Sequence, residues 1–254
     1  MVLFKTIIYI LFLLNQKMML AKLTEKKTLL VGTTGDYKPV SFLNKETNTY
    51  EGIDIEIAKL YAKEKNYKLK FIPTTWPTLL EDTIHNKFDF AICGITITEN
   101  RLKYALMSTG YLTAGKTFLM RKEDVDKYKT IKDVNQPNVR VMINPGGTNE
   151  KFALNNLKQS NITVHQVNEE IPGLISKGAA DIMVTEVMEG LVYINEFDNL
   201  AVPLYKTPFT NDPIGILMNK DKTDLLNELN EWLQEKLDDG TIEEIKKKYI
   251  PFPD

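Results

Sequence analysis

The chain has 254 residues, of which 43% are hydrophobic and 26% are charged, and this composition excludes a disordered or collagen-like polymer. Its 32 Lys and Arg residues nearly balance 34 Asp and Glu residues, so it lacks the basic excess that binding to nucleic acid requires. The single cysteine excludes an internal disulfide, and the two histidines have no partner ligands, so we expect neither a metal site nor a cofactor.

Residues 1–21 are predicted to form a secretory signal peptide. Lys5 precedes an apolar run from Thr6 to Leu14, which suits the hydrophobic region of a signal. The run is shorter than the roughly 20 residues that span a bilayer, and cleavage after Ala21 would remove it. An N-terminal core helix is the alternative. Since no later stretch has membrane length, we expect a periplasmic protein, secreted through the Sec pathway, with no stable membrane insertion of the mature chain.

The next part of the chain alternates strands with helices. Ile53, Ile57 and Tyr61 recur at helical spacing and predict one buried helix face, while Thr98 is a candidate N-cap. Pro77 fits the first turn of a further helix. The expected strands cover residues 28–32, 68–72 and 88–93, and the expected helices cover residues 53–63, 76–85 and 98–104.

The same alternation then begins again. The expected strands cover residues 139–143, 162–165 and 180–184, and the expected helices cover residues 148–157, 169–176 and 186–193. Strands separated by helices favour parallel sheets joined by crossovers. Two amphipathic helices, over residues 223–237 and 241–249 with Gly240 between them, follow near the end of the chain.

Two successive rounds of strand and helix predict an α/β protein with two lobes. Because the chain returns through Pro208, we expect a discontinuous first lobe of residues 24–114 plus 209–254, and a second lobe of residues 115–208. Ligands of open parallel sheets bind at the carboxyl ends of the strands. Polar residues, glycines and helix N-termini follow the predicted strands, so we expect a ligand cleft between the lobes.

Several motifs carry a resemblance to known proteins. Tyr50-Glu-Gly-Ile-Asp54 and Gly94-Ile-Thr-Ile-Thr-Glu-Asn-Arg101 resemble motifs of the type II periplasmic solute-binding fold for polar amino acids. The resemblance runs from about Thr28 to Tyr249. It implies a periplasmic-binding-protein-like fold, with the ligand held in the cleft between two lobes.

A second set of motifs resembles the cyclohexadienyl dehydratases, which are periplasmic enzymes of the same superfamily (solute-binding protein family 3). These motifs are Gly32-Thr-Thr-Gly-Asp-Tyr-Lys-Pro39, Pro73-Thr-Thr-Trp-Pro77, Gly115-Lys-Thr117 and Asn144-Pro-Gly-Gly-Thr-Asn-Glu-Lys-Phe-Ala153. The last is the most specific, because ordinary binders usually lack its flanking asparagines. The resemblance implies a decarboxylating dehydration of prephenate to phenylpyruvate, and of arogenate to phenylalanine.

The resemblance places the general acid of this reaction at Glu189. The departing hydroxyl must be protonated, which suits a carboxylic acid whose pKa is raised by a desolvated site. Glu189 lies three residues after Glu186, so both carboxyls are expected on one helix face, where like charges raise one pKa. The alternative is a solvated Glu that interacts with the helix dipole.

The same resemblance implies how the substrate is held. Arg101 matches the carboxylate clamp of the family, completed by Thr96, although a surface cation is the alternative. Asn144 and Asn149 flank a Gly-Gly turn that opens a helix, an arrangement that suits an anion, or else they only cap that helix.

Two aromatic residues and a lysine are further candidates for substrate binding. Tyr37 and Trp76 match the aromatic pair that sandwiches ligands in this fold, although either residue alone would also suit a hydrophobic core. Lys116 lies where the chain enters the second lobe, and a solvated lysine is the alternative.

Glu186 departs from the family pattern, in which Asp is usual at this position. In the binding proteins that carboxylate meets the α-ammonium group of the ligand. The additional methylene of Glu186 displaces the charge and weakens the case for arogenate, whereas prephenate has no amine and is less affected.

A second function remains open, because the fold serves both enzymes and transport receptors. The alternative is a periplasmic receptor that delivers an amino acid, another small zwitterion or a carboxylate to an ABC permease. The element from Asn144 to Ala153 and the presence of Glu189 favour the enzyme.

Overall fold

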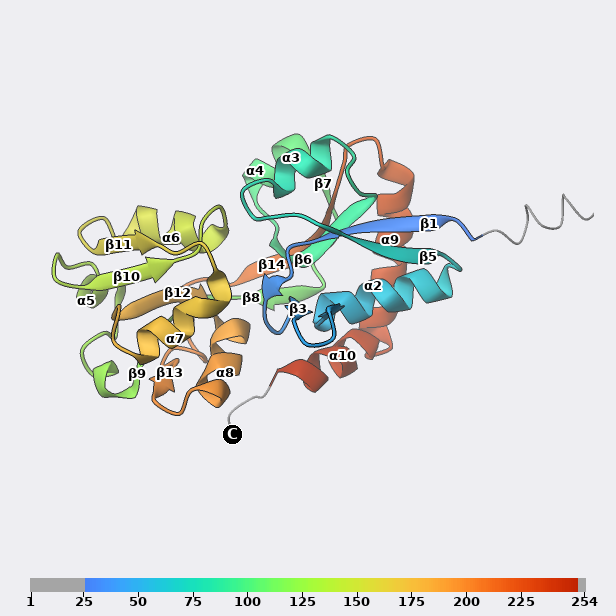
Figure 1. Cartoon of the computed structure of the whole chain (residues 1–254). Helices are drawn as coiled ribbons and strands as arrows, with labels where there is room; N and C mark the ends of the chain where they lie inside the picture. The colour runs from blue at the N-terminus through green and yellow to red at the C-terminus, as the bar shows by residue number, and fades with distance from the viewer. Residues whose placement is uncertain (1–25, 251–254) are drawn as a thin grey trace, which may run out of the picture.

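The computed structural model describes residues 26–250, in which two β-sheets each carry helices on both faces (Figure 1). The predicted signal peptide, residues 1–21, lies outside the described residues. A small antiparallel sheet that the sequence did not predict follows the first strand. It consists of β2 (Asp36–Tyr37), β3 (Ser41–Asn44) and β4 (Thr49–Glu51).

The first large sheet has the strand order β5-β1-β6-β14-β7, with β8 paired to β14. Its strands are β1 (Thr28–Thr33), β5 (Lys68–Pro73), β6 (Phe90–Thr96), β7 (Leu106–Met107), β8 (Leu112–Ala114) and β14 (Asp212–Met218). As predicted, β1 is parallel to β5 and β6, but β14 is antiparallel to β6, β7 and β8. The antiparallel strand β14 was not predicted from the sequence.

The helices that pack on this sheet are α2 (Ile53–Glu64), α3 (Leu79–Ile84), α4 (Glu99–Tyr104), α9 (Thr223–Asp238) and α10 (Thr241–Tyr249). The buried face of α2 follows the predicted spacing, and its Tyr61 ring packs against Trp232 of α9 with 5.2 Å between centroids. Thr98 caps α4 by accepting a hydrogen bond from the Arg101 amide. α3 is shorter than predicted because residues 76–78 form a turn.

The second large sheet has the strand order β11-β10-β12-β9-β13. Its strands are β9 (Lys116–Arg121), β10 (Arg140–Ile143), β11 (Asn161–Val164), β12 (Ile182–Glu186) and β13 (Leu200–Ala201). β10 is parallel to β11 and β12, whereas β9 is antiparallel to β12 and β13. The accompanying helices are α5 (Ile131–Val134), α6 (Thr148–Asn156), α7 (Ile171–Ser176) and α8 (Val187–Glu196), with the 3-10 turns η1 (Lys122–Asp124) and η2 (Asn168–Glu170).

The chain passes between the two sheets twice, once from β8 to β9 and once from β13 to β14 (Figure 1). We propose that the first lobe comprises residues 24–114 plus 209–254 and the second lobe residues 115–208. Residues 24–25 and 251–254 of that proposal lie outside the described part of the chain.

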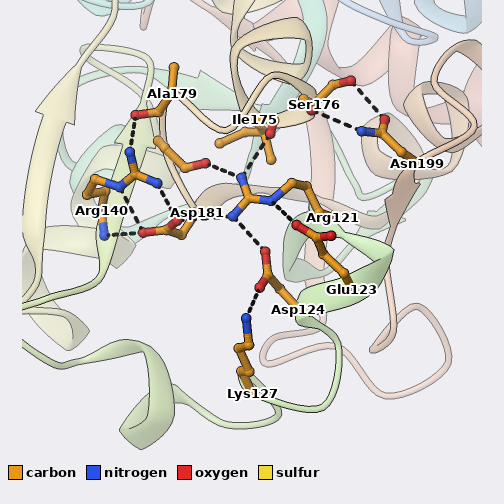
Figure 2. Close-up of polar contacts among 11 residues, drawn as sticks. Arg121, Glu123, Asp124, Lys127, Arg140, Ile175, Ser176, Ala179, Asp181 and Asn199 are labelled. Atoms are coloured by element: carbon orange, nitrogen blue, oxygen red, sulfur yellow. Dashed lines mark hydrogen bonds and ion pairs between the residues drawn. The ribbon is translucent and has the colours of Figure 1, made fainter.

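Two of the three arginines in the sequence stabilise the second lobe at a corner formed by β9, β10 and α7 (Figure 2). Arg121 donates to the carbonyls of Ile175, at 3.1 Å, and Ala180, at 2.8 Å, while both Arg121 and Arg140 pair with Asp181. Burial tends to raise the pKa of Asp181, but the hydrogen bonds from the arginines outweigh it and lower the pKa to about 2.

Replacing Asp181 with Asn should lower the free energy of unfolding at pH 7 by about 1–2 kcal/mol, because two guanidinium groups lose their charged partner in a site that solvent partly screens. The ordinary pKa of 3.8 falls to about 2 on folding, so this stabilisation is present above pH 3.8 and is lost as the pH falls through 2. In urea unfolding, the difference between parent and variant should shrink as the pH falls from 4 to 2.

The matched control is Asp126→Asn, which removes only an exposed ion pair with Lys129 and should leave the unfolding curve unchanged. A difference between the parent and Asp181→Asn that stayed constant from pH 7 to pH 2 would contradict the assignment of the stabilisation to the ionised Asp181 carboxylate.

Candidate functional site

A pocket lies between the two sheets, where residues that follow the carboxyl ends of several strands meet. Seven of its lining residues come from the segment between β9 and β13, and three come from the segment between β1 and β8. The lining residues are Tyr37, Trp76, Gly94, Asn144, Gly147, Thr148, Asn149, Asn168, Glu186 and Glu189. Six of the nine candidate site residues from the sequence are thereby brought together, and the other three lie beside the pocket, as described below.

Glu189 lies in the first turn of α8 and is only 1% exposed, so it is not a solvated surface residue. Asn168 donates to its Oε1 at 2.6 Å, and the Thr185 hydroxyl donates to its Oε2. Burial raises the pKa of Glu189 to about 8, helped by the charge of Glu186, although the two donated hydrogen bonds oppose the shift. At neutral pH the carboxyl is therefore mostly protonated and can act as an acid.

Glu186 is the last residue of β12 and precedes α8, so the expectation that it shares a helix face with Glu189 is wrong. Its carboxylate forms a buried ion pair with Lys116 and accepts a hydrogen bond from the Tyr37 hydroxyl. Lys116 is 2% exposed and also donates to Thr148 at 2.7 Å, so it is not a solvated lysine. Glu186 is thus compensated by a cation, whereas Glu189 is not.

Arg101 lies beside the pocket rather than in its lining, on helix α4. Its Nη1 donates to the Thr96 carbonyl at 2.6 Å, and the Thr96 hydroxyl lies 3.5 Å from the Thr148 hydroxyl of the opposite side. Within residues 26–250 this is the one hydrogen bond that the guanidinium donates, which leaves its other N–H groups available to a ligand carboxylate.

Replacing Arg101 with Lys should weaken the binding of an anionic ligand by about 1.5–3 kcal/mol, because a point charge replaces the planar fork. Isothermal titration calorimetry with prephenate, the dianion that the motif resemblance implies as substrate, would measure this change in affinity. The control is Lys103→Met, which removes an exposed cation from the same helix. Equal affinities of the parent and Arg101→Lys would remove Arg101 from the site.

The aromatic pair forms one wall of the pocket. The rings of Tyr37 and Trp76 meet edge to face with 6.4 Å between centroids, and the Trp76 indole donates to Asp36 at 3.0 Å. Gly94 has a φ of +75°, and a Cβ at this position would clash with the Tyr37 ring. A glycine is therefore needed here to let the ring lie against the end of β6.

The motif of residues 144–153 meets the motif of residues 73–77 across the pocket. Gly146 has a φ of +82°, and a Cβ there would lie 2.5 Å from the backbone nitrogen of Pro77. The N-cap of α6 is Gly147, and it makes no side-chain capping hydrogen bond, so neither Asn144 nor Asn149 caps that helix. Their amide oxygens are buried without a partner among the described residues, which leaves them free to contact a ligand.

The two hydrogen-bond partners of Glu189, Asn168 in the pocket lining and Thr185 beside it, were not singled out from the sequence. Asn168 precedes Glu189 by 21 residues, and no local pattern links the two. Thr185 lies four residues before Glu189, and a hydroxyl at the junction of β12 and α8 was the signal that could have identified it. Both residues hold the carboxyl of Glu189 in place.

Within residues 26–250, no three His, Cys, Asp or Glu side chains are grouped as metal ligands would be. The same part of the chain has no helix that is long and apolar enough to cross a membrane.

Two α/β sheets with a polar pocket between them form the type II periplasmic-binding-protein fold, and the chain belongs to the bacterial extracellular solute-binding proteins, family 3, which it matches over residues 29–252. It is a homologue of the cyclohexadienyl dehydratase of Pseudomonas aeruginosa, with 33% identity over 237 residues, 93% of this chain and 88% of that protein. The resemblance inferred from the sequence motifs, to the family and to this enzyme, is thereby confirmed.

Two solved structures extend this comparison. One is the ancestral amino acid-binding protein AncCDT-1, a precursor of cyclohexadienyl dehydratase, with 37% identity and a TM-score of 0.81 over 88% of this chain and 96% of that one. The other is a variant of an ancestral cyclohexadienyl dehydratase, AncCDT-3, with 47% identity and a TM-score of 0.53 over 87% of this chain and 92% of that one. These relatives include both an enzyme and an amino acid-binding protein.

Proposed function

We propose that this chain is a cyclohexadienyl dehydratase that converts prephenate to phenylpyruvate. The observation that carries the proposal is Glu189, a buried carboxyl that faces the pocket with a pKa raised to about 8. A transport receptor needs no acid that stays protonated at neutral pH, whereas a dehydratase does. The similarity to the dehydratase of Pseudomonas aeruginosa supports the same conclusion.

The reaction needs one proton and releases carbon dioxide and water. Glu189 gives its proton to the ring hydroxyl, and the carbon–oxygen bond breaks as water leaves. The bond between the ring and its carboxylate breaks at the same time, and its electron pair makes the ring aromatic. Glu189 then regains a proton from solvent. Aromatisation provides the driving force, so the chain has mainly to deliver the proton and to hold the substrate dianion in the correct orientation toward the acid.

The remaining residues would bind and orient the substrate. Arg101, with Thr96, would hold one carboxylate, and the amides of Asn144 and Asn149 would hold the other carboxylate or the hydroxyl. Tyr37 and Trp76 would flank the ring. Every one of these roles is part of the proposal.

Arogenate is the alternative substrate, and the pairing of Glu186 argues against it. The ammonium group of arogenate would need an anionic partner, but Glu186 already faces Lys116 and Tyr37. We therefore propose that prephenate is preferred.

A second candidate function is a receptor for an amino acid or a small carboxylate that partners an ABC permease. It is supported by the similarity to AncCDT-1, which is an amino acid-binding protein. Both functions fit a periplasmic location, which the extracellular family supports. The predicted signal peptide of residues 1–21 would direct the chain there.

A turnover assay separates the two functions. The purified chain is incubated with prephenate at pH 7, and phenylpyruvate and carbon dioxide are measured. Formation of both at a rate far above the uncatalysed reaction would support the dehydratase. Absence of turnover together with tight binding of an amino acid in calorimetry would support the receptor.

A further inference from the structure

Asn168, in η2, is held between the two sides of the pocket and is 4% exposed. Its Nδ2 donates to the backbone carbonyl of Asp36 at 3.1 Å and to Glu189 Oε1 at 2.6 Å. A backbone carbonyl can only accept a hydrogen bond, so this contact fixes which end of the amide is nitrogen. The orientation of the Asn168 amide is therefore set by the fold.

The other end of this amide is the unusual feature. Asn168 Oδ1 is buried and accepts no hydrogen bond from any residue of the described chain. Buried acceptors are rarely left unpaired, because they lose their bonds to water. The residue lines the pocket, so a ligand is the available source of a donor.

Asn144 and Asn149 differ from Asn168 in one respect. Their amide oxygens are also buried and unpaired, but no hydrogen bond from their nitrogens to residues 26–250 fixes the amides. Either amide can turn and present a donor or an acceptor to a ligand. Among these three residues, only Asn168 has an amide whose orientation is fixed, so it can offer a ligand only its oxygen, as a hydrogen-bond acceptor.

We infer that Asn168 positions the leaving hydroxyl of the substrate, by accepting the hydrogen bond of that hydroxyl at Oδ1 while its Nδ2 holds Glu189. The inference rests on the proposed function and adds a residue to it. The hydroxyl then turns a lone pair toward the acid, Glu189 transfers its proton to that oxygen, and the group leaves as water with both protons. Asn168 exchanges no proton. It acts as a positioning residue, and it selects a leaving group that carries a hydrogen.

The charged and titratable groups that face this arrangement come from several elements. Glu186 at the end of β12 and Asp36 of β2 both raise the pKa of Glu189, and the Tyr37 and Tyr193 hydroxyls lie within reach of its charge. These groups stay in place when Asn168 is changed, so a shift in the titration of Glu189 reports on Asn168 itself.

The test compares the full chain with Asn168→Ala and the control Asn156→Ala. Asn156 is in the same lobe, outside the pocket, and its Nδ2 also donates to a backbone carbonyl, at 2.8 Å. We expect Asn168→Ala to lower kcat for prephenate about 10- to 100-fold, the range for misplaced reacting groups, with KM changed less than about threefold. Asn156→Ala should keep the parent kcat.

A second readout does not depend on activity. The ionisation of Glu189 is followed by carbon-13 NMR of labelled glutamate carboxyls, assigned with Glu189→Gln. In Asn168→Ala, Glu189 loses the donated hydrogen bond that favours its charged form, so the pKa of Glu189 should rise above the parent value. A residue that only filled space would leave that titration unchanged.

The outcomes separate the two proposals. If the parent turns over prephenate but Asn168→Ala keeps kcat within twofold, the inference is overturned and the proposed function stands. An unchanged Glu189 titration in Asn168→Ala overturns it as well. If the parent forms no phenylpyruvate, the proposed function fails, and the inference fails with it.

Discussion

Replacing Glu189 with Gln should lower the turnover of prephenate by about 10²–10⁴-fold, the usual contribution of general acid catalysis. This corresponds to roughly 3–5 kcal/mol of activation free energy. Gln keeps the shape of the side chain but has no acidic proton to give. Substrate affinity should change little, because the residues proposed to hold the carboxylates are untouched. Steady-state kinetics with both proteins would check the two expectations together.

The pH dependence of turnover provides a second test of Glu189 as the general acid. The reaction needs the protonated form of Glu189, so activity is expected below the pKa of about 8 and should fall as the pH rises through that value. Glu189→Gln should lack this alkaline decline. The matched control is Glu196→Gln, an exposed residue of the same helix that pairs with Lys38, and it should behave as the parent does. Turnover of Glu189→Gln at the parent rate would place the acid elsewhere.

Replacing Lys116 with Met should lower the free energy of unfolding by about 3–5 kcal/mol, because it leaves the Glu186 carboxylate buried without a cation. The ion pair is almost fully shielded from water, so solvent cannot replace the lost partner. Urea unfolding at pH 7 would measure the loss.

A double variant tests the cause of that loss. In Lys116→Met with Glu186→Gln, no charge remains to be compensated, and most of the stability should return. The control is Lys129→Met, which breaks an exposed pair with Asp126 and should leave stability unchanged. A double variant as unstable as Lys116→Met would show that packing, not charge, is what Lys116 provides.

Elements with strong local patterns were predicted well. The helix over residues 241–249 has the bounds observed for α10, and the predicted helix over residues 53–63 differs from α2 by one residue. Apolar periodicity and end signals such as Gly240 and Thr98 depend only on neighbours in the sequence, which is why these elements could be recognised.

Elements that depend on distant partners were not predicted. β14 lies inside the first sheet, between β6 and β7, but its ladder partners, Thr96 and Ala114 among them, are about a hundred residues away in the chain. Its antiparallel direction, like that of β9 in the second sheet, is set by the two passages between the sheets. A local pattern of strands and helices carries no information about either passage, so these two antiparallel strands were not predicted.

The residues of the candidate site were likewise predicted where they belong to local motifs, and their interactions were missed where the partners are distant in the chain. Motifs of contiguous residues pointed to Tyr37, Trp76, Asn144 and Glu189, which all line the pocket. Their partners were hidden, because Asn168 reaches Asp36 over 132 residues and Lys116 reaches Glu186 over 70. The sequence could therefore propose which side chains meet a ligand, but not which of the two glutamates is neutralised by a cation.

The interior position of β14 has a consequence for a chain that emerges N-terminus first. β1, β5 and β6 are complete once residue 96 is available, yet the neighbour of β6 in the sheet consists of residues 212–218. All strands of the second sheet lie within residues 116–201, so that sheet can assemble while the first still has an open edge. Exposed edges invite pairing with other chains. The interval between the emergence of β6 and that of β14 is therefore the period in which this chain most needs protection from aggregation.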